Sequence, residues 1–423
     1  MSGRLSERVR CLGTLDVAGG GQVVVDGNHV FIGHMKPPHG TSIVDVSDRR
    51  NPRLVAEIRL EGDASHTHKV RVAGDLMVVN VEQDDRHFKR RAGAIDAATA
   101  DLAAELRRPP EEAEIARRLG VAPEDMPRLR QARRETYAEG GFRVYDIADR
   151  TRPKLLAHHR THGVGAHRFD LDAKHAYIST EMEGYVGNIL VVYDMADPAK
   201  PEEAGRWWLP GQFVAGGEVP DWPGQSHRLH HAMRCGDELW ASVWNAGFRV
   251  IDAGDLGDLK TIGAYDYHPA IPEPTHTAMP FERRIGGRRI AAVIDEEHDH
   301  VHGRLHAFLW FFDVDDPAAM RPLSAFALDP SASPFSQGPG RFGAHQYHER
   351  LDGTLVYAAW FSGGLRIIDA ADPLLPREVG FFVPEPMGGR PVPQSNDVAV
   401  DDDGIVYLID RHRGLHVLEF DRP

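Results

Sequence analysis

The stretch SIVDVSD at residues 42–48 decides the fold, because its pattern recurs along the chain. An apolar, β-branched run ends at an Asp, and a second Asp follows three residues later. Val, Ile, Phe and Tyr favour a half-buried strand, whereas Asp starts a turn that ends strand pairing. Further copies are FRVYDIAD (142–149), LVVYDMAD (190–197), FRVIDAGD (248–255), WFFDVDD (310–316), LRIIDAAD (365–372) and a degenerate LHVLEFD (415–421).

The spacing of these copies predicts the architecture. The first acidic residue of each copy, which is Glu419 in the last, recurs after 101, 48, 58, 61, 56 and 50 residues. All spacings but the first match one four-stranded blade of a β-propeller. We therefore predict an all-β fold, a single seven-bladed β-propeller over residues 1–423. The segment CLGTLDVAG (11–19) supplies the strand that the last copy lacks, so the two ends of the chain should pair and close the ring.

The long first spacing contains a stretch of different composition. Residues 92–139 are rich in Ala, Glu, Leu and Arg at helical spacing, and Pro109 and Pro110 interrupt them. This composition predicts a helical insertion in the second blade. The insertion is either a solvent-facing decoration or a functional element, namely a lid over one mouth of the channel or a contact through which homo-oligomers form.

Composition and charge limit the classes of partner. A formal net charge of −14 argues against a general nucleic-acid binder, which needs a basic face. No apolar stretch reaches the length of a membrane span, and the N-terminus lacks the apolar run of a signal peptide. With only two cysteines, Cys11 and Cys235, there is no disulfide framework, and we expect a cytoplasmic protein without a membrane partner.

The repeated phrase resembles the LVIVD repeat, as SIVDV, FRVID and LRIID illustrate. Segments such as FGAHQYHE, THTAMP and SNDVAVDDDGIVYLIDRHRGL look like full-length members of that family as well. The resemblance implies a propeller and no defined reaction. A looser similarity of architecture holds with two metalloenzyme propeller families, the carotenoid cleavage oxygenases and the selenium-binding-type methanethiol oxidases, but no motif matches either closely.

Histidines recur at the start of the first strand of successive repeats. This strand lines the central channel of a propeller, so residues at a common height point at one another across it. Among the 24 histidines of the chain, the residues at this position are His66, His68, His167, His227, His230, His231, His276, His345 and His348. In the last repeat, Asp397 occupies this position. The next predicted strand begins eight residues after His68, His231 and Asp397, and nine residues after His167.

A ring of buried imidazoles can be structural, with hydrogen bonds between blades, or it can bind a metal. A neutral imidazole cluster is costly to bury unless it is ligated or paired, which favours a metal. We therefore predict metal ligands among His68, His167, His231, His276 and His345, with His66, His230 and His348 as the other members of the pairs. Several imidazoles with at most one carboxylate suit iron or copper first, and zinc, manganese or nickel as well.

Other side chains near these positions are candidates for catalysis or support. Asp397, Glu82, Glu181 and Tyr347 are the candidate catalytic residues. Glu82, Glu181, Asp295 and Glu349 are candidates for orienting the imidazole rings. An aromatic wall for a substrate could come from Trp244, Tyr347, Trp360 and Phe361, although core packing explains Trp360 equally well. The segment EEHDHVHGRLH (296–306) is predicted as a loop at the channel mouth with accessory metal binding.

Three functions are compatible with this pattern. The first is a metal-dependent oxidoreductase that oxidises or cleaves a small organic substrate with O₂. The second is a non-redox lyase, isomerase or hydrolase in which the metal acts as a Lewis acid. The third is a propeller that only binds other proteins.

Overall fold

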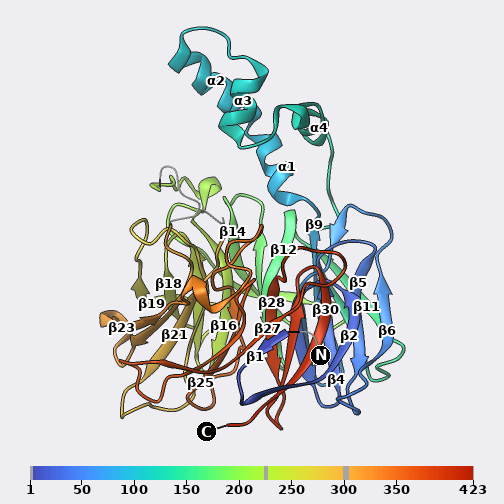
Figure 1. The fold of residues 1–423 in the computed structure, drawn as a ribbon. Coiled ribbons are helices and arrows are strands. Elements are labelled where there is room, and N and C mark those ends of the chain that lie inside the picture. Colours follow the sequence, from blue (N-terminus) through green and yellow to red (C-terminus); the bar gives the residue numbers. More distant parts are fainter. Residues whose placement is uncertain (1–2, 223–226, 299–303, 423) are drawn as a thin grey trace.

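The computed structural model describes residues 3–222, 227–298 and 304–422. Strands are the main regular structure of this part of the chain and far outnumber the helices. They form a broad body of upright sheets, and the helices rise from one end of that body (Figure 1). The all-β prediction is thereby confirmed.

Within the described residues the strands form five hydrogen-bonded sheets, each built from antiparallel meanders of four strands. A single residue pair joins two meanders into one sheet at Gly165 with Glu82, and again at Trp244 with Thr275. The first three meanders contain β3 (Gly20–Asp26), β4 (His29–His34), β5 (His39–Asp45) and β6 (Arg53–Arg59); β8 (Val70–Ala73), β9 (Leu76–Gln83), β10 (Gly141–Asp146) and β11 (Lys154–Arg160); and β12 (His162–Leu171), β13 (His175–Glu181), β14 (Asn188–Asp194) and β15 (Glu202–Trp207).

The remaining meanders follow the same order. They contain β16 (His227–Cys235), β17 (Glu238–Trp244), β18 (Phe248–Asp252) and β19 (Lys260–Tyr265); β20 (Thr275–Pro280), β21 (Ile290–Asp295), β22 (Leu309–Asp313) and β23 (Arg321–Phe326); β24 (Gln346–Tyr347), β25 (Leu355–Trp360), β26 (Gly364–Asp369) and β27 (Arg377–Pro384); and β28 (Ser395–Val400), β29 (Ile405–Asp410) and β30 (Arg413–Phe420). Three further strands add to these: β7 (Ser65–His66) pairs with β9, β1 (Gly3–Leu5) with β27, and β2 (Val9–Ala18) with β30.

The first strands of successive meanders form a closed ring. Each one contacts the next, in the order β3, β8, β12, β16, β20, β24, β28 and again β3. Residues at one end of these strands therefore face a shared central space.

The repeated Asp residues explain why the third strands end where they do. In the first copy, Oδ1 of Asp45 accepts hydrogen bonds from the backbone N–H and the hydroxyl of Ser47, and Oδ1 of Asp48 accepts one from the N–H of Arg50. The same two turns recur in the next five copies. A side chain that captures the backbone N–H two residues ahead removes it from the strand ladder and fixes the turn.

Four helices lie between β9 and β10 of one meander: α1 (Arg86–Gly93), α2 (Ile95–Leu106), α3 (Glu112–Leu119) and α4 (Met126–Ala132). They have a small core of their own, which includes Ile95, Leu102 and Met126. The start of α1 is tied to the body of strands because Arg86 pairs with Glu82 and Arg90 pairs with Glu181. No helix among the described residues is long and apolar enough to cross a membrane.

Candidate metal centre

A cavity of about 210 Å³ lies at the end of the central ring from which α1 rises. The starts of the first strands and the ends of the second strands provide its walls. Its lining includes the histidines His66, His68, His87, His167, His230, His276, His298 and His345.

Six of these histidines form a continuous arc across successive first strands. The ring centroids of neighbours are 4.5 Å apart for His66 and His68, 5.2 Å for His68 and His167, 4.9 Å for His167 and His230, 4.1 Å for His230 and His276, and 4.5 Å for His276 and His345. Burial lowers the pKa of His230, His276 and His345 well below its usual value, and lowers the pKa of His167 to about 3. These four rings are therefore neutral at pH 7, and each has one nitrogen with a lone pair.

His230, His276, His345 and Glu296 form what we call the mouth group. Nδ1 of His230 donates to the carbonyl of His276 over 2.8 Å, and Nδ1 of His345 donates to the carbonyl of Asn396. Nδ1 of His276 lies 3.3 Å from Oγ1 of Thr277, whose hydroxyl proton is given to Gln346, so here too Nδ1 is the donor. All three histidines consequently keep the lone pair on Nε2, as ligating histidines do when an outer partner fixes their tautomer.

The Nε2 lone pairs meet a carboxylate rather than a donor. Nε2 of His276 lies 3.8 Å from Oε2 of Glu296, and Nε2 of His345 lies 3.8 Å from its Oε1. Burial alone would raise the pKa of Glu296, but Arg341 and His345 lower it well below its usual value. A buried carboxylate thus faces the lone pairs of two neutral rings. Bonds of about 2.0–2.2 Å to one ion would place such ligand atoms about 3–4 Å apart, which matches this spacing.

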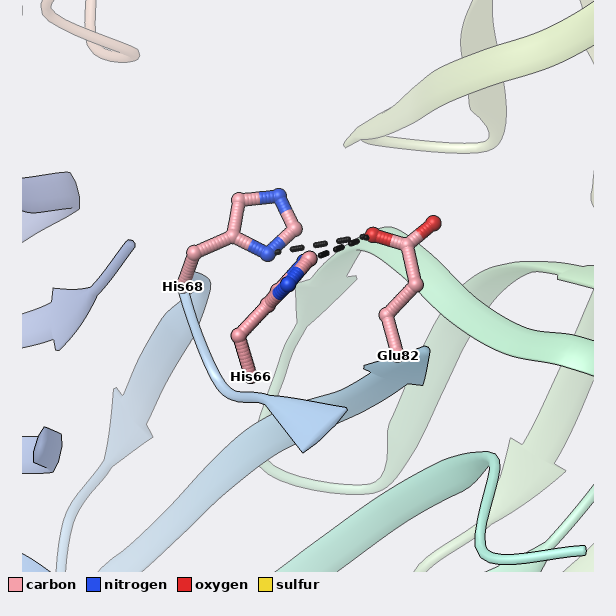
Figure 2. Close-up of side chains that lie close together, drawn as sticks. All are labelled: His66, His68 and Glu82. Carbon is pink, nitrogen blue, oxygen red and sulfur yellow. Dashed lines mark hydrogen bonds and ion pairs between the residues drawn. The ribbon is translucent and has the colours of Figure 1, made fainter. Parts of the chain in front are cut away.

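Glu82, on the other side of the arc, is bonded differently (Figure 2). Its Oε2 lies 3.2 Å from Nε2 of His66, 3.0 Å from Nδ1 of His167 and 2.8 Å from a guanidinium nitrogen of Arg86. Asn80 donates to Nδ1 of His68, so His68 does not offer that nitrogen. Oε1 of Glu82 is buried and has no hydrogen-bond partner in the described part of the chain.

Two sets of ligand atoms lie close enough to hold a metal ion among the described residues. One is His66, His68 and Glu82, and the other is His230, His276 and Glu296, with the atoms of each set within 4.8 Å of one another. Both carboxylates are charged, but the second set has the better chemistry, because Glu82 is already bonded to Arg86 and Asn80 uses Nδ1 of His68.

Other predicted site residues lie at a second level of the channel, away from this cavity. His231 is fully buried, and its Nδ1 is 3.4 Å from Glu349. Both carboxylate oxygens of Asp397 accept backbone N–H groups, from Val23 and Val398, and burial raises the pKa of Asp397 to about 6. His348 and Asp397 line a different pocket, at residues 23–28, 348–350 and 397–403.

The second level is organised around Glu349. Its carboxylate accepts hydrogen bonds from Arg71 and Arg168, and from Gln346 over 3.0 Å. Arg168 is completely buried. The charge of Glu349 is thus balanced by two guanidinium groups, whereas both ring nitrogens of His231 and two nitrogens of Arg168 have no hydrogen-bond partner among the described residues.

The difference between the two levels comes from irregular register at the start of the first strands. The pairing shifts by two residues between His227 and His231 in β16, and by one residue between Ser395 and Asp397 in β28. Such bulges disrupt the ladder locally and re-aim the side chains beside them. His230 and Asn396 therefore line the cavity, whereas His231 and Asp397 do not.

The remaining candidates have structural roles. Glu181 accepts hydrogen bonds from Arg90 and from the N–H of Val164, so it anchors the helices. Asp295 accepts from Tyr267 and Trp310. The hydroxyl of Tyr347 donates to the carbonyl of Ala292. Trp360 is fully buried in the core.

The aromatic wall is made by Trp244 and Phe361. Trp244 lies 5.3 Å from the ring of His230, and Phe361 lies 4.7 Å from the ring of His345. Both have a positive φ, 50° and 25°, which is strained for a bulky residue. Such strain persists where the surrounding structure holds it, and it is common at functional sites.

Glu296, Arg341 and Arg411 are residues of the site that sequence reasoning missed. A signal for part of them was present, because the seventh residue from the start of each second strand reaches the mouth. These residues are Met35, Glu82, Glu181, Trp244, Glu296, Phe361 and Arg411. Of the segment 296–306, residues 299–303 lie outside the described residues, and His306 contacts Glu297 over 2.8 Å.

Comparisons with known proteins address the fold. The sequence model of the LVIVD repeat matches residues 20–59. Raptor from Chaetomium thermophilum is similar in structure, with a TM-score of 0.53 and 10% identity over 100% of this chain and 30% of that one. The Cps50 (Swd1) β-propeller domain from Myceliophteria thermophila has a TM-score of 0.53 and 12% identity over 98% of this chain and 100% of that domain.

At these identities the likeness concerns the fold alone. The chain spans about a third of the Raptor chain, 30% of its length. No curated protein sequence matches the chain. The predicted resemblance to the LVIVD repeat and the propeller fold are confirmed.

Proposed function

The chain is a β-propeller that carries the LVIVD repeat, and we propose that it is a metal-dependent enzyme whose ion is held by the mouth group. One observation carries this proposal. The Nε2 lone pairs of His276 and His345 face the charged carboxylate of Glu296 at 3.8 Å, inside a buried wall. Three hydrogen-bond acceptors that converge in this way repel one another unless a cation lies between them.

The donor set favours a transition metal. Three imidazoles and one carboxylate are ligands typical of iron, copper, zinc, manganese and nickel rather than calcium or magnesium. The outer partners that fix each Nδ1 are the support that ligating histidines need. Because the first strands of several meanders contribute the ligands, the ion would keep open positions towards the cavity, as catalytic sites do.

The reaction we infer is the oxidation or oxidative cleavage of a small organic substrate. An iron or copper ion in the mouth group would supply activation of O₂ and transfer of electrons. The protein's part is to position the substrate in the cavity beside Glu296 and to limit access of water. Trp244 and Phe361 form the apolar wall, and the start of α1 covers one side of the mouth through Arg86 and His87.

We also infer that the meanders are the seven blades of one propeller over the whole chain. The closed ring of first strands and the pairing of β2 with β30 support this count. On this reading, the four helices are an insertion in the second blade, placed over the mouth that contains the histidines.

Metal analysis of matched histidine variants tests the proposal. We would purify the full chain without an affinity tag, from cells supplied with iron, copper, zinc and manganese, and measure its metal content by mass spectrometry. His230→Ala and His345→Ala remove members of the mouth group. His231→Ala and His348→Ala remove the neighbouring histidine of each pair, which lies at the other level, and serve as controls.

We expect near-stoichiometric metal in the wild type and in both controls, and loss of metal in His230→Ala and His345→Ala. Circular dichroism would verify that all four variants fold. Iron or copper with an electron paramagnetic resonance signal supports redox chemistry, whereas zinc would replace it with Lewis-acid chemistry of a lyase, isomerase or hydrolase. Equal metal loss in both members of a pair, or no metal in the folded wild type, would overturn the proposed centre.

A further inference from the structure

Positive charge exceeds negative charge at the lining of the mouth cavity, although the whole chain has a net charge of −14. The cations in the lining are Lys36, Arg86, Arg341 and Arg411, and the carboxylates are Asp84, Asp85 and Glu296; Lys69 also lines the cavity, but burial lowers its pKa well below the usual value. A metal ion in the mouth group would add further positive charge. The cavity is therefore electrostatically complementary to an anion.

Two arginines at this mouth have no carboxylate partner within the described ranges. The guanidinium of Arg411 donates only to the side-chain oxygen of Asn396, over 3.3 Å. That of Arg228 lies 4.6 Å from the ring centre of Trp244, which belongs to the cavity wall. By contrast Arg413, two residues after Arg411, forms an ion pair with Asp16 on the surface.

Arg411 also lies in the field of another cation. Burial and the nearby Arg341 lower the pKa of Arg411 to about 10. A buried guanidinium group near another cation, with open hydrogen-bond donors, gains most from a bound anion that neutralises it.

We infer that the substrate of this site is a small organic anion, whose carboxylate or phosphate group is held by Arg411 while its reactive carbon faces the mouth group, with Arg228 adding positive charge beside the cavity wall. This inference rests on the proposed function, because it names the class of molecule that the same cavity takes. The planar fork of an arginine matches both oxyanions, so the two share one recognition chemistry. With about 210 Å³, the cavity is smaller than the roughly 300–1,000 Å³ typical of drug-sized ligands and fits a small metabolite.

The position of Arg411 explains how the anion would be oriented. Arg411 follows β29 and lines the cavity, whereas Arg228 lies in β16 against Trp244 and outside the lining. Arg341 is already paired with Glu296, and Arg86 with Glu82. The anionic group thus binds to Arg411, and the paired arginines keep the carboxylates in place.

Titration calorimetry with simple anions tests this inference. The probes are succinate and inorganic phosphate, each added to the full chain at two salt concentrations, first metal-free and then after metal loading. Arg411→Met and Arg228→Met remove one charge each with little change in side-chain length. Arg413→Met is the matched control, and Arg411→Lys tests whether charge alone is sufficient.

We expect at least one probe to bind the metal-free wild type and to bind more weakly at higher salt, with affinity reduced about tenfold or more in Arg411→Met and Arg228→Met. Arg413→Met should bind as the wild type does. Preference for one probe would identify the oxyanion. Equal affinity in wild type and Arg411→Met, or no binding of either probe, would overturn the inference.

The outcome is separable from that of the metal proposal. Normal metal content in Arg411→Met with unchanged anion binding would refute the anion site and leave the metal centre standing. If the wild type takes up no metal but binds an anion through Arg411, the metal centre is refuted and the anion site remains. Thermal unfolding of each variant verifies that a lost signal does not come from a lost fold.

Discussion

Glu296 and Glu349 are both buried glutamates beside arginines in the central channel, yet their surroundings differ in one respect. Arg71, Arg168 and Gln346 all donate to the carboxylate of Glu349. Among the described residues, Glu296 has Arg341 as its close donor, and its carboxylate also faces the Nε2 lone pairs of His276 and His345. The comparison teaches that burial and charge alone do not mark a ligand site. What marks it is a surplus of converging acceptors that the described residues leave without donors.

The largest effect is expected on the stability of the protein when the charge of Glu349 is removed. Glu349→Gln leaves Arg168, which is fully buried, without its counter-charge. We expect the free energy of unfolding to fall by about 3–5 kcal/mol, measured by urea denaturation, with normal metal content in the folded fraction. Asp352→Asn removes an exposed partner of Arg350 and should cost less than about 1 kcal/mol. A loss of similar size in both variants would contradict the buried network.

The same substitution of the glutamate in the mouth group should instead change metal binding. Glu296→Gln keeps the shape of the side chain but removes the charged ligand, so we expect metal affinity to fall on the order of 1000-fold, or about 4 kcal/mol. The metal-free variant should be at least as stable as the metal-free wild type, since it no longer has three converging acceptors. Unchanged metal affinity in a competition titration would show that Glu296 is not a ligand.

His416 is a single buried histidine outside the arc, and it serves as a reference for the clustered ones. His416 is 1% exposed, packs on Phe382, and burial lowers its pKa to about 4. The unfolded chain binds a proton near pH 6.5, so stability is fully present above that pH and is lost as the pH falls towards 4. His416→Phe should therefore reduce the loss of unfolding free energy between pH 7 and pH 4 by about 3 kcal/mol. Identical pH profiles for the two proteins would refute this.

The smallest effect is expected at Glu82. This carboxylate orients His66 and His167 rather than completing the mouth group. Glu82→Gln should weaken metal binding by about 10–100-fold, as is usual for residues that support ligands. An effect as large as that of Glu296→Gln would mean that both halves of the histidine arc bind metal directly.

The sequence was sufficient for the strands and turns because their causes are local. The Asp side chains of the repeat capture backbone N–H groups two residues ahead, so Asp45 and Asp48 can be interpreted without tertiary context. The gathering of histidines could be predicted as well. Which histidine of a pair faces the cavity could not, because the irregular pairing before His231 shifts the register of β16 against β17 by two residues. Glu296 was missed because its partners lie on other strands, far away in the sequence.

The seventh positions of the second strands form one rung around the mouth, and each is encoded in a separate repeat. Their occupants range from Met35 through Glu296 and Phe361 to Arg411, while the strand residues before them are mainly apolar and buried, with polar exceptions such as Asn80, Thr180 and Asp295. Distant positions with few shared partners contribute nearly independently to stability. The chemistry of the mouth can therefore diverge one residue at a time during evolution, whereas the scaffold that carries it stays the same.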